Sequence, residues 1–375
     1  MVPQIICRDS DLARVYIGEL YMNRNRLSAL AIIIVALTTG ACQSALAEKA
    51  VSIQQPIDFD PNVAHHADAD ALFWVNQENG ARGVKKVIIP FFQIQFVLDA
   101  QASATGAGGA HAKTAVHLEG ATPAQMQAIT DELYASFVGD LQAAGLEVVT
   151  PEQARTFSAY NEIMASSKPS GETVKGMNGV RSGFFSPTGM NYYFLPTMLP
   201  DLAGGGSMTA VGNAQIVRKE ADLMTQSGAA VAGFRAVVDF ASLSASNRRG
   251  LRALARNAKT KAEFGLLIKP AATQVFLITP NAKATMIDPQ SRMRLELQAP
   301  LMIDSDAILA TDDNRTKGQK TGEILGNAIS LMGGVGMSKT KSFDVVVDPE
   351  LWQKDVTGAL KGVSAAVTAK LKAGL

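Results

Sequence analysis

The hydrophobic pattern becomes regular after Lys85, where the chain continues as KVIIPFFQIQFVL up to Leu98. Polar and apolar side chains alternate over the second half of this run, which is the two-residue period of a strand with one mostly polar face. Pro90 cannot donate a ladder hydrogen bond, so we expect this strand to lie at a sheet edge or to bend there. The alanine, glycine and serine residues of Ala100–Ala112 predict a loop, and Val116–Leu118 predicts a short strand.

The clearest helix in the chain covers Pro123–Ala144. Thr122 is a suitable N-cap residue, proline suits the first helical position, and Gly145 ends the helix. Apolar side chains recur at helical spacing and predict one buried stripe, which consists of Met126, Ile129, Leu133, Phe137 and Leu141.

Two further elements complete a strand–helix–strand pattern. Leu146–Val149 predicts a short buried strand, and Pro151 opens a second helix that runs to about Met164. An α/β layer is the usual arrangement of elements in this order. The sequence therefore predicts an α/β domain over residues 84–165.

Residues 166–375 predict a strand-rich α+β region. An aromatic loop covers Gly176–Gly206, and a helix with Ile216, Leu223 and Met224 inward covers Gly212–Ser227. The predicted strands are Val231–Leu243, Ala262–Lys269, Thr273–Thr279, Lys283–Ile287 and Met293–Leu297. A closing amphipathic helix covers Leu351–Leu371, and its apolar face consists of Val356, Leu360, Val363, Val367 and Leu371. The expected fold class is α/β or α+β: a strand–helix–strand layer, then a strand-rich half and this C-terminal helix.

Residues 22–41 have the three-part layout of a secretory signal. Arg24 and Arg26 supply positive charge, Leu27–Leu37 is apolar except for one serine, and small residues follow. Residues 1–21 carry acidic side chains where a signal is basic. We therefore interpret Met22 as the true start and residues 1–21 as an extension ahead of it; the alternative is an unusually long leader.

The stretch Thr39-Gly40-Ala41-Cys42 resembles the lipobox of bacterial lipoproteins, with threonine where leucine is usual. The resemblance implies that Cys42 is the lipidation site, becomes the new amino terminus and anchors the protein in a membrane. Two alternatives stay open. Cleavage after Ala47 would release a soluble periplasmic protein, and Leu27–Ala47 is long enough to span a bilayer as an uncleaved anchor.

Residues 42–83 predict a tether, because they are polar and without a steady period, with a first ordered segment around Ala71–Val75.

Composition then excludes several classes of function. The formal net charge is +1, from 35 basic and 34 acidic residues, so we expect no nucleic-acid partner. The two cysteines, Cys7 and Cys42, both precede the predicted body, which excludes a disulfide or a thiolate zinc site within it.

Two clusters resemble binding motifs without completing them. Gly333–Thr340 nearly spells a nucleotide-binding loop, but Ser338 stands where glycine precedes the lysine, and the segment leads from a helix into a strand. A glycine-rich turn is therefore the favoured interpretation. Four metal-capable residues lie in the predicted tether, where a solvated polar stretch is favoured over a metal site: His65, His66, Asp68 and Asp70.

The remaining candidates are also weak. His111 and His117 are the only histidines of the predicted body, and no G-x-S-x-G nucleophile accompanies them. Burial over the sheet is favoured for the aromatic residues of Phe184–Phe194. A solvated turn or short helix is favoured for the basic residues of Asn247–Lys261, which are Arg248, Arg249, Arg252, Arg256, Lys259 and Lys261. We therefore predict no catalytic, cofactor-binding or metal-binding residues.

The order of elements from about Lys85 to Met164 resembles the α/β domain shared by TolB amino-terminal domains and the curli-secretion lipoprotein. The resemblance lies in the VIIPFF strand, the long helix and the segment AAGLEVVTPEQA. Together with the export signal, it favours a non-catalytic cell-envelope lipoprotein with an assembly, scaffold or secretion-accessory role. We expect it in the outer membrane facing the periplasm, or soluble in the periplasm, with the membrane, other envelope proteins or further copies as partners. The alternatives are a periplasmic hydrolytic enzyme and a subunit of an oligomeric outer-membrane pore.

Overall fold

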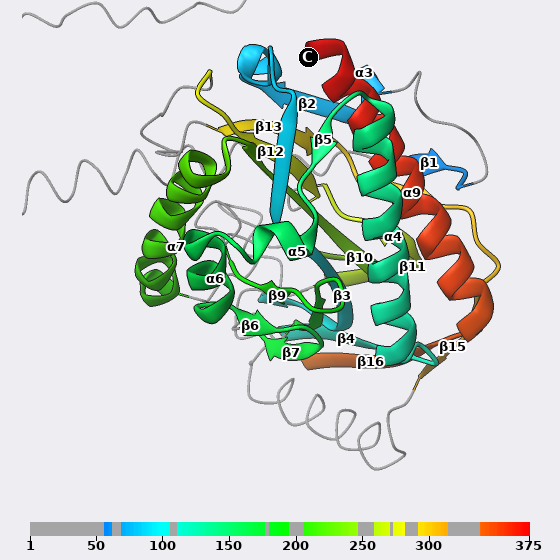
Figure 1. Cartoon of the computed structure of the whole chain (residues 1–375). Coiled ribbons are helices and arrows are strands. Elements are labelled where there is room, and N and C mark those ends of the chain that lie inside the picture. Colours follow the sequence, from blue (N-terminus) through cyan, green and yellow to red (C-terminus); the bar gives the residue numbers. More distant parts are fainter. Residues whose placement is uncertain are drawn as a thin grey trace, which may run out of the picture. The chain divides into compact units, whose positions relative to one another are not determined.

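The computed structural model describes residues 56–61, 69–105, 111–176, 180–194, 206–246, 259–270, 273–281, 292–313 and 338–375. The chain divides into two units: residues 1–54, which lie outside the described residues, and Gln55–Leu375. In the second unit, 14 described strands join in one mixed sheet, and helices pack on it (Figure 1). The mixed α/β class that the sequence predicts is confirmed.

Eight strands form the main path of the sheet. Their order is β1 (Ile57–Phe59), β14 (Leu301–Ile303), β11 (Lys259–Ile268), β10 (Ala230–Ser246), β3 (Lys86–Thr105), β4 (His111–Glu119), β16 (Ser338–Val347) and β15 (Ile308–Asp313). From β10 the sheet also continues through β12 (Gln274–Ile278) and β13 (Arg292–Leu297) to β2 (Phe73–Asn76). Beside β3 lie β5 (Glu147–Val148) and β8 (Arg181–Phe185), and β8 pairs with β7 (Glu172–Lys175). A separate pair consists of β6 (Lys168–Pro169) and β9 (Asn191–Tyr192).

The parallel pair β3–β10 lies in the middle of the sheet and contains Pro90. The prediction that this strand lies at a sheet edge is wrong, because β3 has neighbouring strands on both sides. The alternative prediction was a bend at the proline, and the pairing has a register shift at this position. Ile88 pairs with Val231 and Phe91 with Gly233, so β3 uses one residue more than β10 across Pro90. The extra residue forms a bulge. Because the ladder is interrupted at the bulge, no hydrogen bond is needed from Pro90, which has no N–H group to donate.

The predicted loop at Ala100–Ala112 is wrong at both ends. β3 continues to Thr105 and β4 begins at His111, and the two strands pair in register from Asp99–His117 to Thr105–His111. Small residues have a weak preference for strands, so their composition indicated a loop. Long-range pairing with β4, and of β4 with β16, overrides that local preference.

Helices α4 (Pro123–Ala143) and α9 (Pro349–Gly374) pack against each other on one face of the sheet (Figure 1). Both predicted apolar stripes are confirmed, because all ten of their side chains are buried. Thr122 and Gln125 form a reciprocal capping box at the start of α4, and Asp348 accepts two backbone N–H bonds at the start of α9. The two helices cover the largest apolar core, which includes Phe92 and Phe137.

Helices α6 (Ser158–Ala165) and α7 (Gly206–Ser227) cover the other face. Phe91 and Ile88 of β3 pack into this second core, whereas Phe92 and Ile89 pack into the first. Ile216 and Leu223 of α7 are buried here as predicted. The helix expected from Pro151 to Met164 is instead two helices, α5 (Pro151–Ala154) and α6, separated by a turn.

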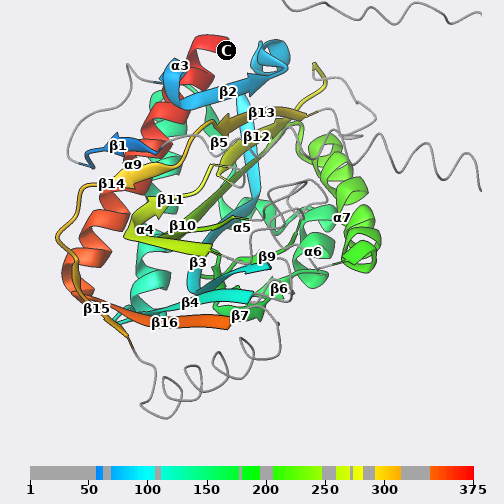
Figure 2. The same cartoon turned by 180° about the vertical axis from the view of Figure 1, so that it is seen from behind.

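The amino-terminal part of the folded unit departs from the predicted tether. The segment before residue 83 contributes β1, α3 (Ala69–Leu72), β2 and the 3-10 helix η2 (Glu78–Ala81). β1 pairs in parallel with β14, as Figure 2 shows, and β2 pairs with β13. Order around Ala71–Val75 is as predicted. The regions 84–165 and 166–375 share one sheet through β3 and β10, and the expected strand at Lys283–Ile287 lies outside the described residues.

Candidate functional site

Three ionisable side chains from adjacent strands meet on the β8–β3–β4 part of the sheet. Asp99 of β3 lies opposite His117 of β4 and Arg181 of β8. Arg181 donates from Nε to Asp99 Oδ2 at 2.5 Å and from Nη2 to Oδ1 at 3.2 Å, and His117 Nδ1 bonds to Oδ1. Each side chain is about one third exposed. We call this the Asp99 cluster; strand pairing builds it from residues far apart in the chain.

The electrostatics of the Asp99 cluster keep its carboxyl group ionised. Partial burial raises the pKa of Asp99, but hydrogen bonds from Arg181 and His117 outweigh burial and hold this pKa below its usual value. A carboxylate that holds Nδ1 of a histidine leaves Nε2 free to transfer a proton. Among the described residues, no hydroxyl or thiol is hydrogen-bonded to His117. His111 lies six residues along β4, about 20 Å away, so the two histidines do not share a site.

A band of buried polar side chains crosses the sheet on the face that α6 and α7 cover. Arg235 donates from Nη2 to Gln95 Oε1 at 2.7 Å, and Gln95 donates from Nε2 to Ser182 Oγ at 3.0 Å. Gln93, opposite Arg235 in the register, is fully buried, and neither atom of its amide has a partner. Amide and guanidinium groups can bind polar or anionic ligands, but their burial here also fits a structural network.

A second set of buried polar side chains connects α7 with the sheet. The Glu220 carboxylate of α7 pairs with Arg292 of β13 and accepts a hydrogen bond from the Tyr193 hydroxyl at 2.7 Å. The guanidinium carbon of Arg292 lies 4.7 Å from the ring centre of Phe276. Burial and the neighbouring Glu220 raise the pKa of Tyr193 well above its usual value, so this hydroxyl stays protonated and donates. All of these side chains are at least 98% buried.

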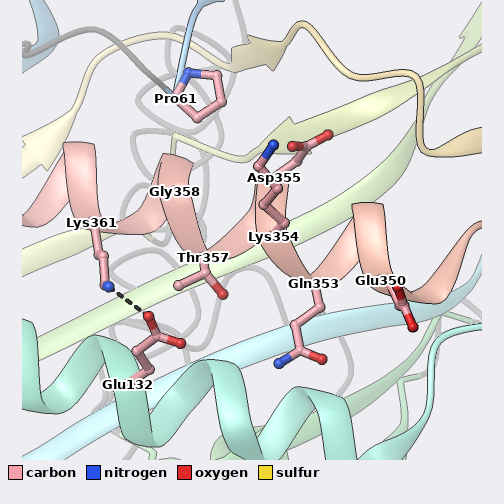
Figure 3. Close-up of a pocket in the computed structure, with 9 residues that line it drawn as sticks. All are labelled: Pro61, Glu132, Glu350, Gln353, Lys354, Asp355, Thr357, Gly358 and Lys361. Carbon is pink, nitrogen blue, oxygen red and sulfur yellow. Dashed lines mark hydrogen bonds and ion pairs between the residues drawn. The ribbon is translucent and has the colours of Figure 1, made fainter.

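A groove of about 550 Å³ lies along α9 and is lined by α9 residues, by Glu132 of α4 and by Pro61 (Figure 3). Glu350, Gln353 and Thr357 extend from α9 toward α4. At one end of the groove, Lys361 of α9 donates to Glu132 of α4 at 2.6 Å. Thr357 is 7% exposed, and its Oγ1 has no hydrogen-bond partner. We call this feature the α4–α9 groove.

The structure separates the other candidates that the sequence singled out. Cys42, His65, His66 and Asp68 lie outside the described residues. Asp70 lies on α3 and forms an ion pair with Lys370 at 2.6 Å. The predicted burial of the aromatic residues is confirmed: Phe184, Phe185, Tyr192, Tyr193 and Phe194 are all buried.

The glycine-rich and basic segments are described only in part. Ser338–Thr340 begin β16, and the glycines before them lie outside the described residues. Lys259 and Lys261 belong to β11, so the predicted turn or helix is wrong at that end, and the arginines lie outside the described residues. In the part of the chain that is described, no three His, Cys, Asp or Glu residues are placed to hold a metal ion.

The polar groups that the structure brings together were not predicted from the sequence. A lone arginine within the apolar segment VAGFRAVVDF was the available signal for Arg235, because a charge inside a strand of this kind must be buried with partners. No comparable signal marked Asp99, Arg181 or Thr357, which are common residue types in unremarkable positions. Only pairing between distant strands and helices gives them neighbours.

Comparison with known proteins adds no relative. No family model matches the chain, and neither the curated proteins nor the solved structures contain a match. Within the described residues, no helix is long and apolar enough to cross a membrane.

Proposed function

We propose that this protein is a bacterial cell-envelope lipoprotein with a non-catalytic assembly, scaffold or secretion-accessory role. The observation that carries the proposal is the segment of residues 22–42. It joins two arginines, an apolar run, small residues and Cys42 in the order that export and lipid modification require. Acyl chains on Cys42 would hold the protein on the outer membrane, facing the periplasm.

The short length of chain between Cys42 and the folded unit supports a role close to the membrane. The unit begins at Gln55, so only residues 43–54 separate the two. Twelve residues span about 40 Å at most when fully extended. A body held within that distance meets membrane proteins and other lipoproteins at a raised local concentration, which favours assembly with them.

Intact-mass measurement of the protein extracted from membranes tests the proposal. An acylated chain that begins at Cys42 is the expected result. A bare chain that begins at Glu48 would point to a soluble periplasmic protein, and an unprocessed chain in the cytosol would remove the basis for an envelope role. Cys42→Ala should move the protein from the membrane to the soluble fraction; if it instead resists carbonate extraction, the pore alternative gains support.

A periplasmic hydrolase is the second candidate, and one specific observation favours it. The Asp99 carboxylate holds Nδ1 of His117, which is how histidine is oriented as a general base. His117 Nε2 would then activate a water molecule or a substrate hydroxyl group. Measurement of ester and amide hydrolysis by His117→Ala and Asp99→Asn beside the unchanged protein decides this candidate. This site is excluded if both variants keep the hydrolytic activity of the unchanged protein. It is also excluded if none of the three proteins is active.

A further inference from the structure

Five strand ends that lie together at one end of the sheet carry lysines and no acidic residue. β3 and β10 run parallel, so their last residues lie at the same end, and pairing brings the first residues of β4, β11 and β16 to them. The rings of Phe264 in β11 and Phe343 in β16 are in contact, with centres 5.5 Å apart, which places these two strands side by side. We call these strand ends the basic end, which consists of Ala102–Thr105, His111–Thr114, Ser244–Ser246, Lys259–Lys261 and Ser338–Lys341.

Three lysines of the basic end lie on two adjacent strands without a counter-charge. Lys339 and Lys341 of β16 are exposed, and Lys113 of β4, which lies opposite the residue between them, is half-buried. None of the three forms an ion pair with a described residue. Elsewhere Lys361 is paired with Glu132, so exposed lysines of this protein do find carboxylates where one is near. Like charges on neighbouring strands repel each other, and an anionic partner removes that cost.

The sequence concentrates further positive charge between two of these strand ends. Residues 247–261 join β10 to β11 and include the first residues of β11, and they carry six basic residues and no acidic one. Without this segment the chain has 29 basic and 34 acidic residues, which is a net charge of −5 in place of +1. Positive charge is therefore unevenly distributed along the chain. A concentration of one sign of charge attracts the opposite sign over about 8–10 Å at physiological salt.

The reach of the tether and the residue types of the basic end favour a membrane surface as its partner. β1, the first strand of the folded unit, pairs with β14, which pairs with β11 at Ile268. Ile268 is nine residues from Lys259, about 30 Å along the strand. The twelve residues between Cys42 and the folded unit span up to about 40 Å, so acyl chains on Cys42 and the basic end can meet the same bilayer. The basic end contains no Phe, Tyr or Trp on which nucleic-acid bases would stack.

We propose that the basic end docks on the anionic phospholipid surface of a membrane, with Lys113, Lys339 and Lys341 against the headgroups. Each lysine close to such a surface is attracted by the negative lipid potential, which falls off within one Debye length. This inference rests on the proposed envelope location and adds a second membrane contact, which orients the body on its tether. An electrostatic contact is reversible, so the acyl chains on Cys42 still decide whether the protein stays in the membrane fraction.

Vesicle binding by the unacylated chain tests the basic end without the lipid anchor. The chain begins at residue 42 and carries Cys42→Ser, and it is sedimented with phosphatidylcholine vesicles that contain about 30% phosphatidylglycerol. We expect binding in about 50 mM salt and an affinity about tenfold lower in about 300 mM salt, because salt screens the attraction. Vesicles of phosphatidylcholine alone should not bind the chain, since they carry no net charge.

Matched variants separate the basic end from the charge of the whole protein. Lys339→Gln with Lys341→Gln should weaken binding about tenfold and leave the melting temperature unchanged, because both side chains are exposed. Lys85→Gln with Lys354→Gln is the control, which removes the same charge from two exposed lysines outside the basic end and should weaken binding less than about twofold.

Four results would each overturn the proposal. The first three are no binding to the phosphatidylglycerol vesicles, equal binding to phosphatidylcholine alone, and an equal loss of affinity in both double variants. The fourth is a chain that does not bind the vesicles but binds poly-glutamate, which would assign the basic end to an acidic polypeptide instead. Because the probe chain carries no acyl group, such a failure leaves lipidation at Cys42 untouched.

Discussion

The buried pair between Glu220 and Arg292 allows a sharp prediction about what attaches α7 to the sheet. Among the described residues, Glu220→Leu would leave the buried Arg292 cation with only the face of Phe276 beside it, and would leave the Tyr193 hydroxyl without an acceptor. Arg292→Met would leave the Glu220 carboxylate with a single neutral donor. Breaking a buried pair by removing one partner costs about 3–5 kcal/mol, so we expect a loss of that size in the free energy of unfolding from each substitution.

The double variant should lose much less than the sum of the two. With both charges gone, leucine and methionine fill the space between α7 and β13, and no uncompensated charge remains. The remaining cost is the unpaired Tyr193 hydroxyl, about 1–3 kcal/mol. We therefore expect a coupling energy of about 3 kcal/mol or more between the two positions.

Urea unfolding followed by circular dichroism at pH 7 measures these differences in the unacylated Cys42→Ser chain. Glu147→Gln is the matched control, because Glu147 forms an exposed ion pair with Lys86 at 2.7 Å. Its loss should cost less than about 1 kcal/mol. If each single variant loses no more free energy of unfolding than this control, burial does not give the Glu220–Arg292 pair its effect, and the reasoning is refuted. The reasoning is also refuted if the loss in the double variant equals the sum of the two single losses.

Three further substitutions give expected outcomes in the same unfolding assay. A Cβ atom at Gly233 would lie 2.2 Å from Phe276 Cζ, so Gly233→Ala should destabilise the protein by about 1–3 kcal/mol; an unchanged midpoint contradicts this close contact. Gln93→Leu should stabilise it by about 1 kcal/mol, because two unpaired buried atoms disappear; a loss of stability would mean that the amide has a partner after all. Asp99→Asn should cost up to about 1 kcal/mol at pH 7. Because the folded-state pKa of Asp99 is lowered, that difference should begin to shrink as the pH falls below about 4 and should be lost as the pH falls through the folded-state pKa; a difference that does not shrink with falling pH contradicts the assignment.

The sequence predicted best the elements whose stability is local. Thr122, Pro123 and the apolar stripe of α4 specify a helix through capping and spacing within one segment, and the structure confirms both ends within one residue. α9 was recognised for the same reason. The ends of β3 and β4 that lie within the predicted loop Ala100–Ala112 were missed, because alanine and serine pair there only with the support of the neighbouring strands.

The candidate sites were less predictable than the fold. The sequence marked His117 as chemically capable but could not supply Asp99 and Arg181 as its neighbours, which are 18 and 64 residues away. Likewise, the polar residues of α9 that line the groove are visible in the sequence as the solvent side of an amphipathic helix. The groove itself depends on residues from other segments, such as Glu132 of α4, which lies 229 residues from Lys361.

The chain alone determined the local elements, because helices form through contacts three or four residues apart. It also contains the whole of the predicted export signal, since Arg24, the apolar run and Cys42 follow one another in linear order. Tertiary structure decided which polar groups are buried, which charges pair and which hydroxyl lacks a partner. These properties depend on strand register and on helix packing between segments far apart in the sequence, and a change of one residue in register moves every side chain to the other face of the sheet.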